Sequence, residues 1–253
     1  MDLGLKGKVA IVTGTGRKGA MGATIAAELA KEGANIACVD IVIEGAEEIA
    51  KDISGMGVKA IAVKADQSDP QQVKDAVAKI VTELGTVDIL VNNAAMMGPF
   101  GRIERMEISD FQKMVEINLD GCYYWIREVW NGMVEKNWGR IINISSIAGV
   151  MGGFGQVNYS ATKAGVIGIA KTAALEGARK GITANTVTLG VVATGQDVET
   201  GEAAERLKAR IAKREFGKPE DVANMVAFLV SEKAGYVTGQ DIHVMGGLDL
   251  FTY

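Results

Sequence analysis

The sequence predicts one α/β domain in which helices cover both faces of a doubly wound parallel sheet of about seven strands. Short runs rich in Val, Ile and Ala alternate along the chain with longer segments of helical period. These runs are continuously apolar rather than alternating, which is typical of strands buried on both faces. No repeat, low-complexity segment or long linker interrupts them. We therefore expect residues 1–253 to form a single domain.

Composition and charge exclude several classes of function. The 253 residues are 48% hydrophobic and carry a net charge of −4 that is scattered along the chain, so no basic patch is expected to bind nucleic acid. No apolar run approaches the ~20 residues that span a bilayer, and the N-terminus has no apolar segment of signal length. The two cysteines lie in apolar surroundings and the single histidine, His243, lies in a strand-like run, which predicts no metal site. These features predict a cytoplasmic protein without membrane or nucleic-acid partners.

A glycine-rich loop joins the first predicted strand, residues 8–14, to a helix that ends at Gly33. Small residues let the backbone approach a pyrophosphate, and the first N–H groups of a helix favour negative charge. The alternative is that this turn binds no ligand, and the position of the turn between a strand and a helix argues against that alternative. The expected contacts with a dinucleotide in this loop are Gly14, Gly16, Arg17, Gly19 and Met21.

The second predicted strand, residues 35–40, ends in Asp40. A carboxylate there can accept both hydroxyls of an adenosine ribose, while the alternative is that Asp40 only caps the following helix. Asp40 should repel the 2′-phosphate of NADP and Ile41 offers no compensating cation, whereas Arg17 and Lys18 act in the opposite sense. We therefore expect NAD as the cofactor, with NADP disfavoured.

The next two strands also end in residues suited to a cofactor. The strand of residues 59–64 leads to Asp66 and Gln67, where Asp66 could accept the adenine amino group. The strand of residues 87–91 leads to Asn93, Ala94 and Ala95, whose small side chains are suited to flanking a ligand rather than filling a core. We expect all five to contact the dinucleotide.

Tyr159 and Lys163 form the chemical centre of the sequence. Residues four apart lie one turn apart on one face of the predicted helix, residues 158–179, so the ammonium should lie close to the phenol. A free phenol titrates near pH ~10, and we expect the cation to lower that pKa by roughly three units. Ser146, with Ser145 as the nearest rival, follows the fifth predicted strand and could hold a substrate oxygen. The long predicted helix of residues 109–138 contains Asn118 and Gly121, which predict a local break.

These motifs resemble those of the short-chain dehydrogenases/reductases, in the branch with a single domain of the Rossmann fold and an Asn-Ser-Tyr-Lys tetrad. The resemblance covers essentially the full length. The matching residues are Thr13-Gly14 with the glycine-rich turn, Asn92-Asn93-Ala94-Ala95, Asn118, Ser146, Tyr159-x-x-x-Lys163 and the loop Gly190–Thr194. The sequence departs from the family pattern in a glycine loop about two residues longer, in Ala95 where glycine is commoner, and in Leu189 where proline usually precedes Gly190.

The resemblance implies a role for each member of the tetrad. Tyr159 is the proton donor or acceptor, Ser146 orients the substrate oxygen, Lys163 lowers the phenol pKa and binds the nicotinamide ribose, and Asn118 holds a proton-relay water. Gly190, Val192 and Thr194 are expected to contact the cofactor. The implied reaction is reversible hydride transfer between a nicotinamide and a carbinol carbon.

The expected substrate pocket is largely apolar. Beside Ser146 it should be lined by Met97, Met151, Phe154 and Val191, which predicts a small-molecule secondary alcohol or ketone on a hydrophobic, cyclic or aromatic skeleton. One alternative is an NADPH-dependent biosynthetic reductase of ketoacyl type. Another is a protein that senses a dinucleotide without catalysis, and the complete tetrad argues against it.

Two expectations concern the surface. The acidic segment from Asp197 to Arg210 predicts a helical lid over the substrate, within a region of about residues 191–213. The helix of residues 158–179 has small residues on all sides, so it should be covered by the sheet on one side and by a second copy of the chain on the other. The long aromatic helix before it would join this contact, and we expect a homotetramer.

Overall fold

In the part of the chain that the computed structural model describes, residues 2–194 and 200–250, seven parallel strands form the middle layer of the molecule in the order β3-β2-β1-β4-β5-β6-β7. The bounds are β1 Val9–Thr13, β2 Asn35–Asp40, β3 Ala60–Lys64, β4 Ile89–Asn92, β5 Gly139–Ser146, β6 Ile182–Leu189 and β7 Asp241–Val244. Val, Ile and Ala dominate these strands, and most of their side chains are buried because helices cover both faces. The predicted doubly wound parallel sheet is confirmed.

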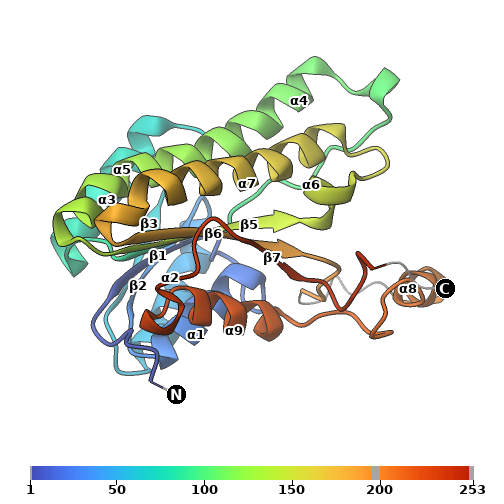
Figure 1. Ribbon diagram of the computed structural model, residues 1–253. Helices are drawn as coiled ribbons and strands as arrows, with labels where there is room; N and C mark the ends of the chain where they lie inside the picture. The colour runs from blue at the N-terminus through green and yellow to red at the C-terminus, as the bar shows by residue number, and fades with distance from the viewer. Residues whose placement is uncertain (1, 195–199, 251–253) are drawn as a thin grey trace.

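Helices cover the sheet in two layers (Figure 1). One layer contains α1 Met21–Lys31, α2 Ile43–Ser54 and α9 Pro219–Leu229, and the other contains α3 Pro70–Leu84, α4 Ile108–Val115, α5 Gly121–Lys136 and α7 Val157–Gly177. Each layer has its own apolar cluster against the sheet, one around Ile25 and Ile36 and the other around Trp125 and Ile141. The short helices α6 Ile147–Met151 and α8 Glu202–Lys208 lie beyond the carboxyl ends of the strands.

The strand order reverses between β1 and β4, so the loops that follow these two strands diverge at one point of the sheet edge. Thr13, the last residue of β1, joins the two loops. Its hydroxyl accepts the N–H groups of Asn93 at 3.0 Å and of Ala94 at 2.9 Å, and the Asn93 amide donates to the Thr13 carbonyl at 2.8 Å. This reversal point opens at the carboxyl edge of the sheet.

The long helix predicted for residues 109–138 is interrupted, as Asn118 and Gly121 indicated. A π-helical turn, Glu116–Asp120, separates α4 from α5. Other boundaries differ slightly from expectation: α7 ends at Gly177 and is followed by a 3₁₀ turn, Ala178–Lys180. Of the predicted lid, α8 is helical, and residues 195–199 lie outside the described part of the chain.

Within the described residues, no helix is long and apolar enough to cross a membrane. The same residues contain no cluster of three or more His, Cys, Asp or Glu side chains that could hold a metal ion. The expected cytoplasmic location stays a prediction.

Candidate functional site

The glycine loop packs directly against the ends of β2 and β4. Gly14 has a φ of +74°, and a Cβ atom there would lie 2.8 Å from the Ala94 Cα atom. A Cβ atom on Gly16 would lie 2.6 Å from the Asp40 Cγ atom. Only glycine fits at these two positions. The N–H groups of Gly14 and Gly16 are bonded to β2, at the Val39 carbonyl oxygen and the Asp40 carboxylate, so these bonds hold the loop against the end of that strand.

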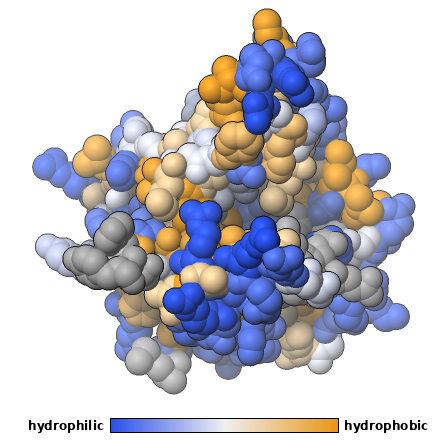
Figure 2. Space-filling view, turned by 90° about the vertical axis from the view of Figure 1, so that its right-hand side faces the viewer, coloured by the Kyte–Doolittle hydropathy of each residue, from blue (hydrophilic) through white to orange (hydrophobic). Residues whose placement is uncertain are grey.

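One cavity, called the main cavity, has a volume of about 770 Å³ and runs along the carboxyl edge of the sheet. Figure 2 shows this edge, with hydrophobic residues gathered in its upper part and hydrophilic residues below. The main cavity brings together most of the residues that the sequence indicated, from the ends of β1, β2, β4, β5 and β6 with the segments that follow them, and from α7: Gly14, Gly16, Arg17, Met21, Asp40, Asn93, Ala94, Ala95, Met97, Ser146, Tyr159, Lys163, Gly190, Val191, Val192 and Thr194.

A second, smaller hollow of about 440 Å³ shares Gly14, Asp40, Ala94 and Ala95 with the main cavity. It is lined by the other residues predicted for the adenosine end, namely Ile41, Asp66 and Gln67. Among the residues described, Gly19 lines neither hollow. Its φ of +74° turns the loop at a point where a Cβ atom would meet nothing within 4 Å.

Asp40 is held in place by backbone donors. Its Oδ2 atom accepts the Gly16 N–H at 2.6 Å and its Oδ1 atom accepts the Val42 N–H at 2.9 Å. The N-cap of α2 is Val42, so Asp40 lies two residues before the cap position. Lys18 in the lengthened loop is paired elsewhere, since its Nζ atom lies 2.7 Å from the Asp52 carboxylate and 3.7 Å from that of Glu48.

The two serines after β5 are clearly distinguished. The buried Ser145 hydroxyl donates to the Lys163 carbonyl oxygen at 2.7 Å and so ties β5 to α7. Ser146 is the N-cap of α6, where its hydroxyl accepts the Ala148 N–H at 3.2 Å, and it also hydrogen-bonds the Tyr159 side chain. Ser146 is therefore the serine that can share a substrate oxygen with Tyr159.

Tyr159 and Lys163 lie on the first turns of α7 and are both buried, with only 8% of Tyr159 exposed. The Lys163 Nζ atom donates to the Ile144 carbonyl oxygen at 2.8 Å and lies 5.7 Å from the centre of the Tyr159 ring. Burial lowers the pKa of Lys163 to about 8. A buried amine with so low a pKa is still mainly a cation at neutral pH.

The expectation that Lys163 lowers the phenol pKa is not met. Burial raises the pKa of Tyr159, and the hydrogen bond from Ser146 opposes this rise. The Lys163 ammonium donates to the Ile144 carbonyl oxygen, and among the hydrogen bonds of the described residues none joins it to the phenol. The sequence spacing places the two residues on one face and cannot specify where the ammonium points.

Asn118 lies buried in the π turn and, unlike Ser146, Tyr159 and Lys163, is not among the described residues that line the main cavity. Its Oδ1 atom accepts the Met96 N–H at 2.7 Å, and its Nδ2 atom donates to the Met96 carbonyl oxygen at 3.0 Å. The side chain thus fixes the loop that follows β4. The role of holding a relay water stays a prediction for this residue.

Two of the residues predicted for the substrate pocket lie elsewhere. Among the described residues, Met151 and Phe154 do not line the main cavity. Phe154 is 86% exposed and lies in a separate hollow with Arg102, whose guanidinium carbon is 5.4 Å from the ring centre. Gly152 and Gly155 have φ values of +77° and +73°, and this turn separates the segment from the catalytic end of the cavity.

Phe100 is a site residue that the sequence did not reveal. Its ring meets the Tyr159 ring edge-on, with centres 5.9 Å apart and planes at 71°. The loop is held there by Asn158, which donates to the Pro99 carbonyl oxygen at 3.1 Å, and by the Gly101 N–H, which donates to Gly155 at 2.8 Å. No motif marks Phe100, because its contact joins a loop to α7 across more than 50 residues of sequence.

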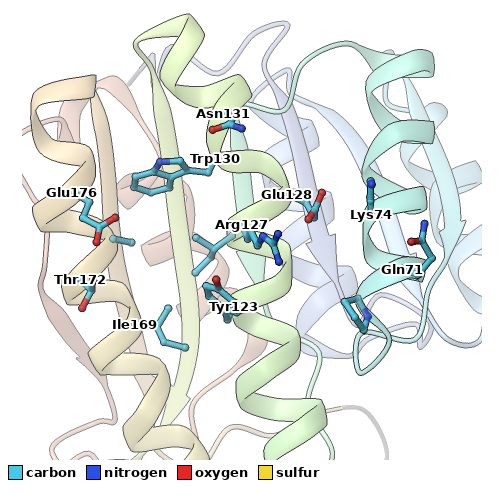
Figure 3. Close-up of a pocket in the computed structure, with 13 residues that line it drawn as sticks. Gln71, Lys74, Tyr123, Arg127, Glu128, Trp130, Asn131, Ile169, Thr172 and Glu176 are labelled. Atoms are coloured by element: carbon cyan, nitrogen blue, oxygen red, sulfur yellow. The ribbon is translucent and has the colours of Figure 1, made fainter.

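A further hollow of about 780 Å³ lies on the outer face of α3, α5 and α7, away from the tetrad (Figure 3). It is lined by apolar groups such as Ile169 and Trp130, and by charged groups of both signs, among them Lys74, Arg127 and Glu176. No member of the tetrad lines it. This outer face is therefore separate from the catalytic centre.

Comparisons with known proteins agree with this geometry. Residues 14–249 match the family model described as enoyl-(acyl carrier protein) reductase. The 3-oxoacyl-[acyl-carrier-protein] reductase FabG of Staphylococcus aureus (strain Mu50) is 41% identical over 244 residues, which cover 95% of this chain and 98% of that protein. FabG of Aquifex aeolicus is 38% identical over 250 residues, 98% of this chain and 100% of the relative.

A solved structure is also similar. A blue fluorescent protein from a metagenomic library, crystallised in complex with NADPH, superposes with a TM-score of 0.89 at 34% sequence identity. The match covers 96% of this chain and 98% of that one.

Proposed function

Since this chain belongs to the short-chain dehydrogenase/reductase family of nicotinamide-dependent oxidoreductases, we propose that it interconverts a secondary alcohol and a ketone with Tyr159 as the acid/base. One observation carries the proposal. Tyr159, Ser146 and Lys163 line one end of the main cavity, and the glycine loop and Asp40 line the same cavity. A dinucleotide bound along it would therefore bring its reactive ring to the tetrad.

The residues present fit a dinucleotide. Glycines at 14 and 16 allow the loop to approach the ends of β2 and β4, and the N-terminus of α1 follows the loop to face a pyrophosphate. When bound, the nicotinamide supplies or accepts the hydride. In the reductive direction Tyr159 donates its proton to the carbonyl oxygen, while the Ser146 hydroxyl orients that oxygen. Lys163, which lines the same cavity, is proposed to bind the nicotinamide ribose.

The best-supported substrate is a 3-oxoacyl thioester. Two relatives that align over at least 95% of this chain, at 41% and 38% identity, are named for reduction of 3-oxoacyl groups on acyl-carrier protein. The net charge of −4 is unfavourable for an acidic carrier, so a small thioester such as acetoacetyl-coenzyme A is the appropriate first probe.

The second candidate is oxidation of a hydrophobic secondary alcohol with NAD. Met97 and Val191 line the main cavity beside Ser146, and neither offers a charge to a polar substrate. Asp40 favours the cofactor that lacks a 2′-phosphate. Measured kcat/KM for acetoacetyl-coenzyme A and for a panel of cyclic and aromatic alcohols, each with NAD(H) and NADP(H), discriminates between the two candidates.

Different observations favour NADP and NAD as the cofactor. The similar solved structure contains NADPH, which favours NADP. In this chain, Asp40 stands at the end of β2 with its carboxylate bonded to the glycine loop, and Lys18 is paired with Asp52. We give greater weight to the residues of this chain and propose NAD.

Substitution of the phenol tests the proposed reaction. Tyr159→Phe should keep dinucleotide binding, measured by fluorescence titration, while kcat falls by about 10²–10⁴-fold because the proton donor is lost. Tyr236→Phe is the matched control, since Tyr236 is fully exposed. Turnover at the native rate in Tyr159→Phe would refute the acid/base assignment, and absence of turnover by the native protein with every substrate would favour the sensing alternative.

Self-association remains part of the proposal. The outer face of α5 and α7 exposes Tyr123 and Leu175, the latter at 84%, and a Cβ atom on Gly168 would meet nothing within 4 Å. Arg127, Glu128 and Glu176 on this face, with Lys74 on the neighbouring α3, provide charges of both signs that two copies related by a two-fold axis could pair.

Light scattering tests the expected homotetramer. Leu175→Glu should reduce the particle mass by breaking the contact, whereas Met56→Glu, at an exposed position after α2, should not. A native protein of monomer mass at micromolar concentration would contradict the proposal.

A further inference from the structure

The π turn that carries Asn118 changes the hydrogen bonding of the helix. In an α-helix the Gly121 N–H would bond to the carbonyl oxygen four residues earlier, at Ile117. Here it bonds to Glu116, five residues earlier. The Ile117 carbonyl oxygen, which the Gly121 N–H has left, lies next to Asn118 in the chain. A backbone carbonyl oxygen that loses its helical partner needs another donor, because leaving it unpaired costs free energy.

Gln67, in the turn between β3 and α3, supplies such a group. Its Nε2 atom donates to the Ile117 carbonyl oxygen at 2.8 Å and to the Ala94 carbonyl oxygen at 3.1 Å. One amide thus joins the π turn to the loop after β4. The two carbonyl oxygens are 50 and 27 residues away from Gln67 in the sequence.

Two local features hold Gln67 in this position. The Asp66 carboxylate accepts both the N–H and the hydroxyl of Ser68, at 2.9 and 2.7 Å, so the turn after β3 is internally bonded. Gly121 leaves space for the side chain, because a Cβ atom there would lie 2.7 Å from the Gln67 Cγ atom and 2.9 Å from its carbonyl oxygen. The glycine in α5 and the glutamine after β3 are therefore complementary.

We propose that Gln67 is a positioning residue for catalysis, whose amide holds the π turn and Asn118 in register with the end of β4. Asn118 in turn binds both backbone groups of Met96, so the amide of Gln67 and the amide of Asn118 clamp the same loop at two points. That loop borders the main cavity at Ala94 and Ala95. The inference rests on the proposed function, because it gives the π turn a part in turnover.

Three variants test the inference. Gln67→Leu removes the donor and keeps a side chain of similar size. Gln67→Glu places a carboxylate against two carbonyl oxygens, so it can donate only when protonated. Gln240→Leu is the matched control, since the exposed Gln240 side-chain amide donates only to the Thr238 carbonyl oxygen among the contacts described.

The expected results separate positioning from cofactor contact. In Gln67→Leu, kcat should fall about five- to thirty-fold, as expected for loss of one or two kcal/mol, while the dissociation constant of the dinucleotide changes less than about threefold. Amide hydrogen exchange of residues 116–122, measured without cofactor or substrate, should become faster. The kcat of Gln67→Glu relative to the native protein should rise as pH falls toward about 5, because the carboxyl then regains a donor.

Each contrary outcome is distinct. Native kcat and native exchange in Gln67→Leu would overturn the inference, and so would a loss confined to dinucleotide affinity, which would assign Gln67 to the adenine end alone. The exchange measurement does not depend on activity. If Tyr159→Phe kept its turnover, the proposed function would fail while the exchange result still decided whether Gln67 holds the π turn.

Discussion

Replacement of Asp40 should change the choice of cofactor. The native protein should prefer NAD by at least about a hundredfold in kcat/KM, which corresponds to ~2.7 kcal/mol, and Asp40→Ala should lose most of that preference. The carboxylate is held at the end of β2 by the N–H groups of Gly16 and Val42, so it cannot easily turn away from a 2′-phosphate.

The magnitude follows from the charges at this end of the cavity. Two unit charges about 4 Å apart at an effective dielectric constant of ~20 interact by about 4 kcal/mol, and a phosphate carries more than one charge. The attraction between an exposed cation and the phosphate contributes only ~0–1 kcal/mol. The Lys18 Nζ atom is already 2.7 Å from the Asp52 carboxylate, which further limits its attraction for a 2′-phosphate. Repulsion by Asp40 should therefore exceed attraction by the loop.

The assay is steady-state kinetics with NAD(H) and NADP(H) at one ionic strength, for the native protein, Asp40→Ala and Asp40→Asn. The asparagine variant keeps an acceptor for the two backbone N–H groups and loses only the charge, so it isolates the electrostatic part. A native preference for NADP would refute the reasoning. An unchanged ratio in both variants would show that another group sets the choice.

Three further changes probe the catalytic end and the chain end. Phe100→Ala should admit water to the phenol and lower the pKa of Tyr159, because burial is the main cause of the raised pKa of that phenol. The pH profile of alcohol oxidation should therefore move to lower pH. The same shift in Phe154→Ala would contradict this reason. Because burial lowers the pKa of Lys163 to about 8, kcat/KM for reduction should decline above about that pH. Lys163→Met should abolish this decline together with most of the turnover. A flat pH profile of kcat/KM through pH ~9 would show that the cation is not needed. The hydrogen bond that His243 donates to the Asp249 carboxylate raises the pKa of His243. The stabilising effect of this bond is complete below the unfolded-state pKa of His243 and is lost as pH rises through its folded-state pKa. Melting temperatures should show Asp249→Asn destabilised at low pH and close to the native protein at high pH, and an equal difference at both would exclude this linkage.

The order of strands and helices could be predicted because each element has its own local pattern of apolar and polar residues. Continuous apolar runs such as Val9–Thr13 and Ile89–Asn92 require burial on both faces, and the segments between them have helical period. The ends of those strands then identify most of the cavity, because parallel strands place their carboxyl ends on one edge. Asp40, Ala94 and Ser146 all line the main cavity for this reason.

Contacts between loops could not be predicted in this way. Phe154 belongs to a segment beside Tyr159 in the sequence, yet the turn at Gly152 and Gly155 places it in another hollow. Phe100 reaches Tyr159 from a loop with no motif. Such contacts depend on the path of the backbone between elements, which spacing along the chain does not describe.

The amino-acid pattern alone is sufficient for the fold class, the cavity edge and the residue types of the tetrad, since these follow from periodicity and from strand direction. Tertiary structure decides the electrostatics and the support of the site. The Lys163 ammonium bonds to the Ile144 carbonyl oxygen, and at Tyr159 burial, opposed by the hydrogen bond with Ser146, raises the pKa of the phenol. Gln67 reaches the π turn across 50 residues of sequence. Both depend on the direction in which a side chain points after folding, and packing against distant segments sets that direction.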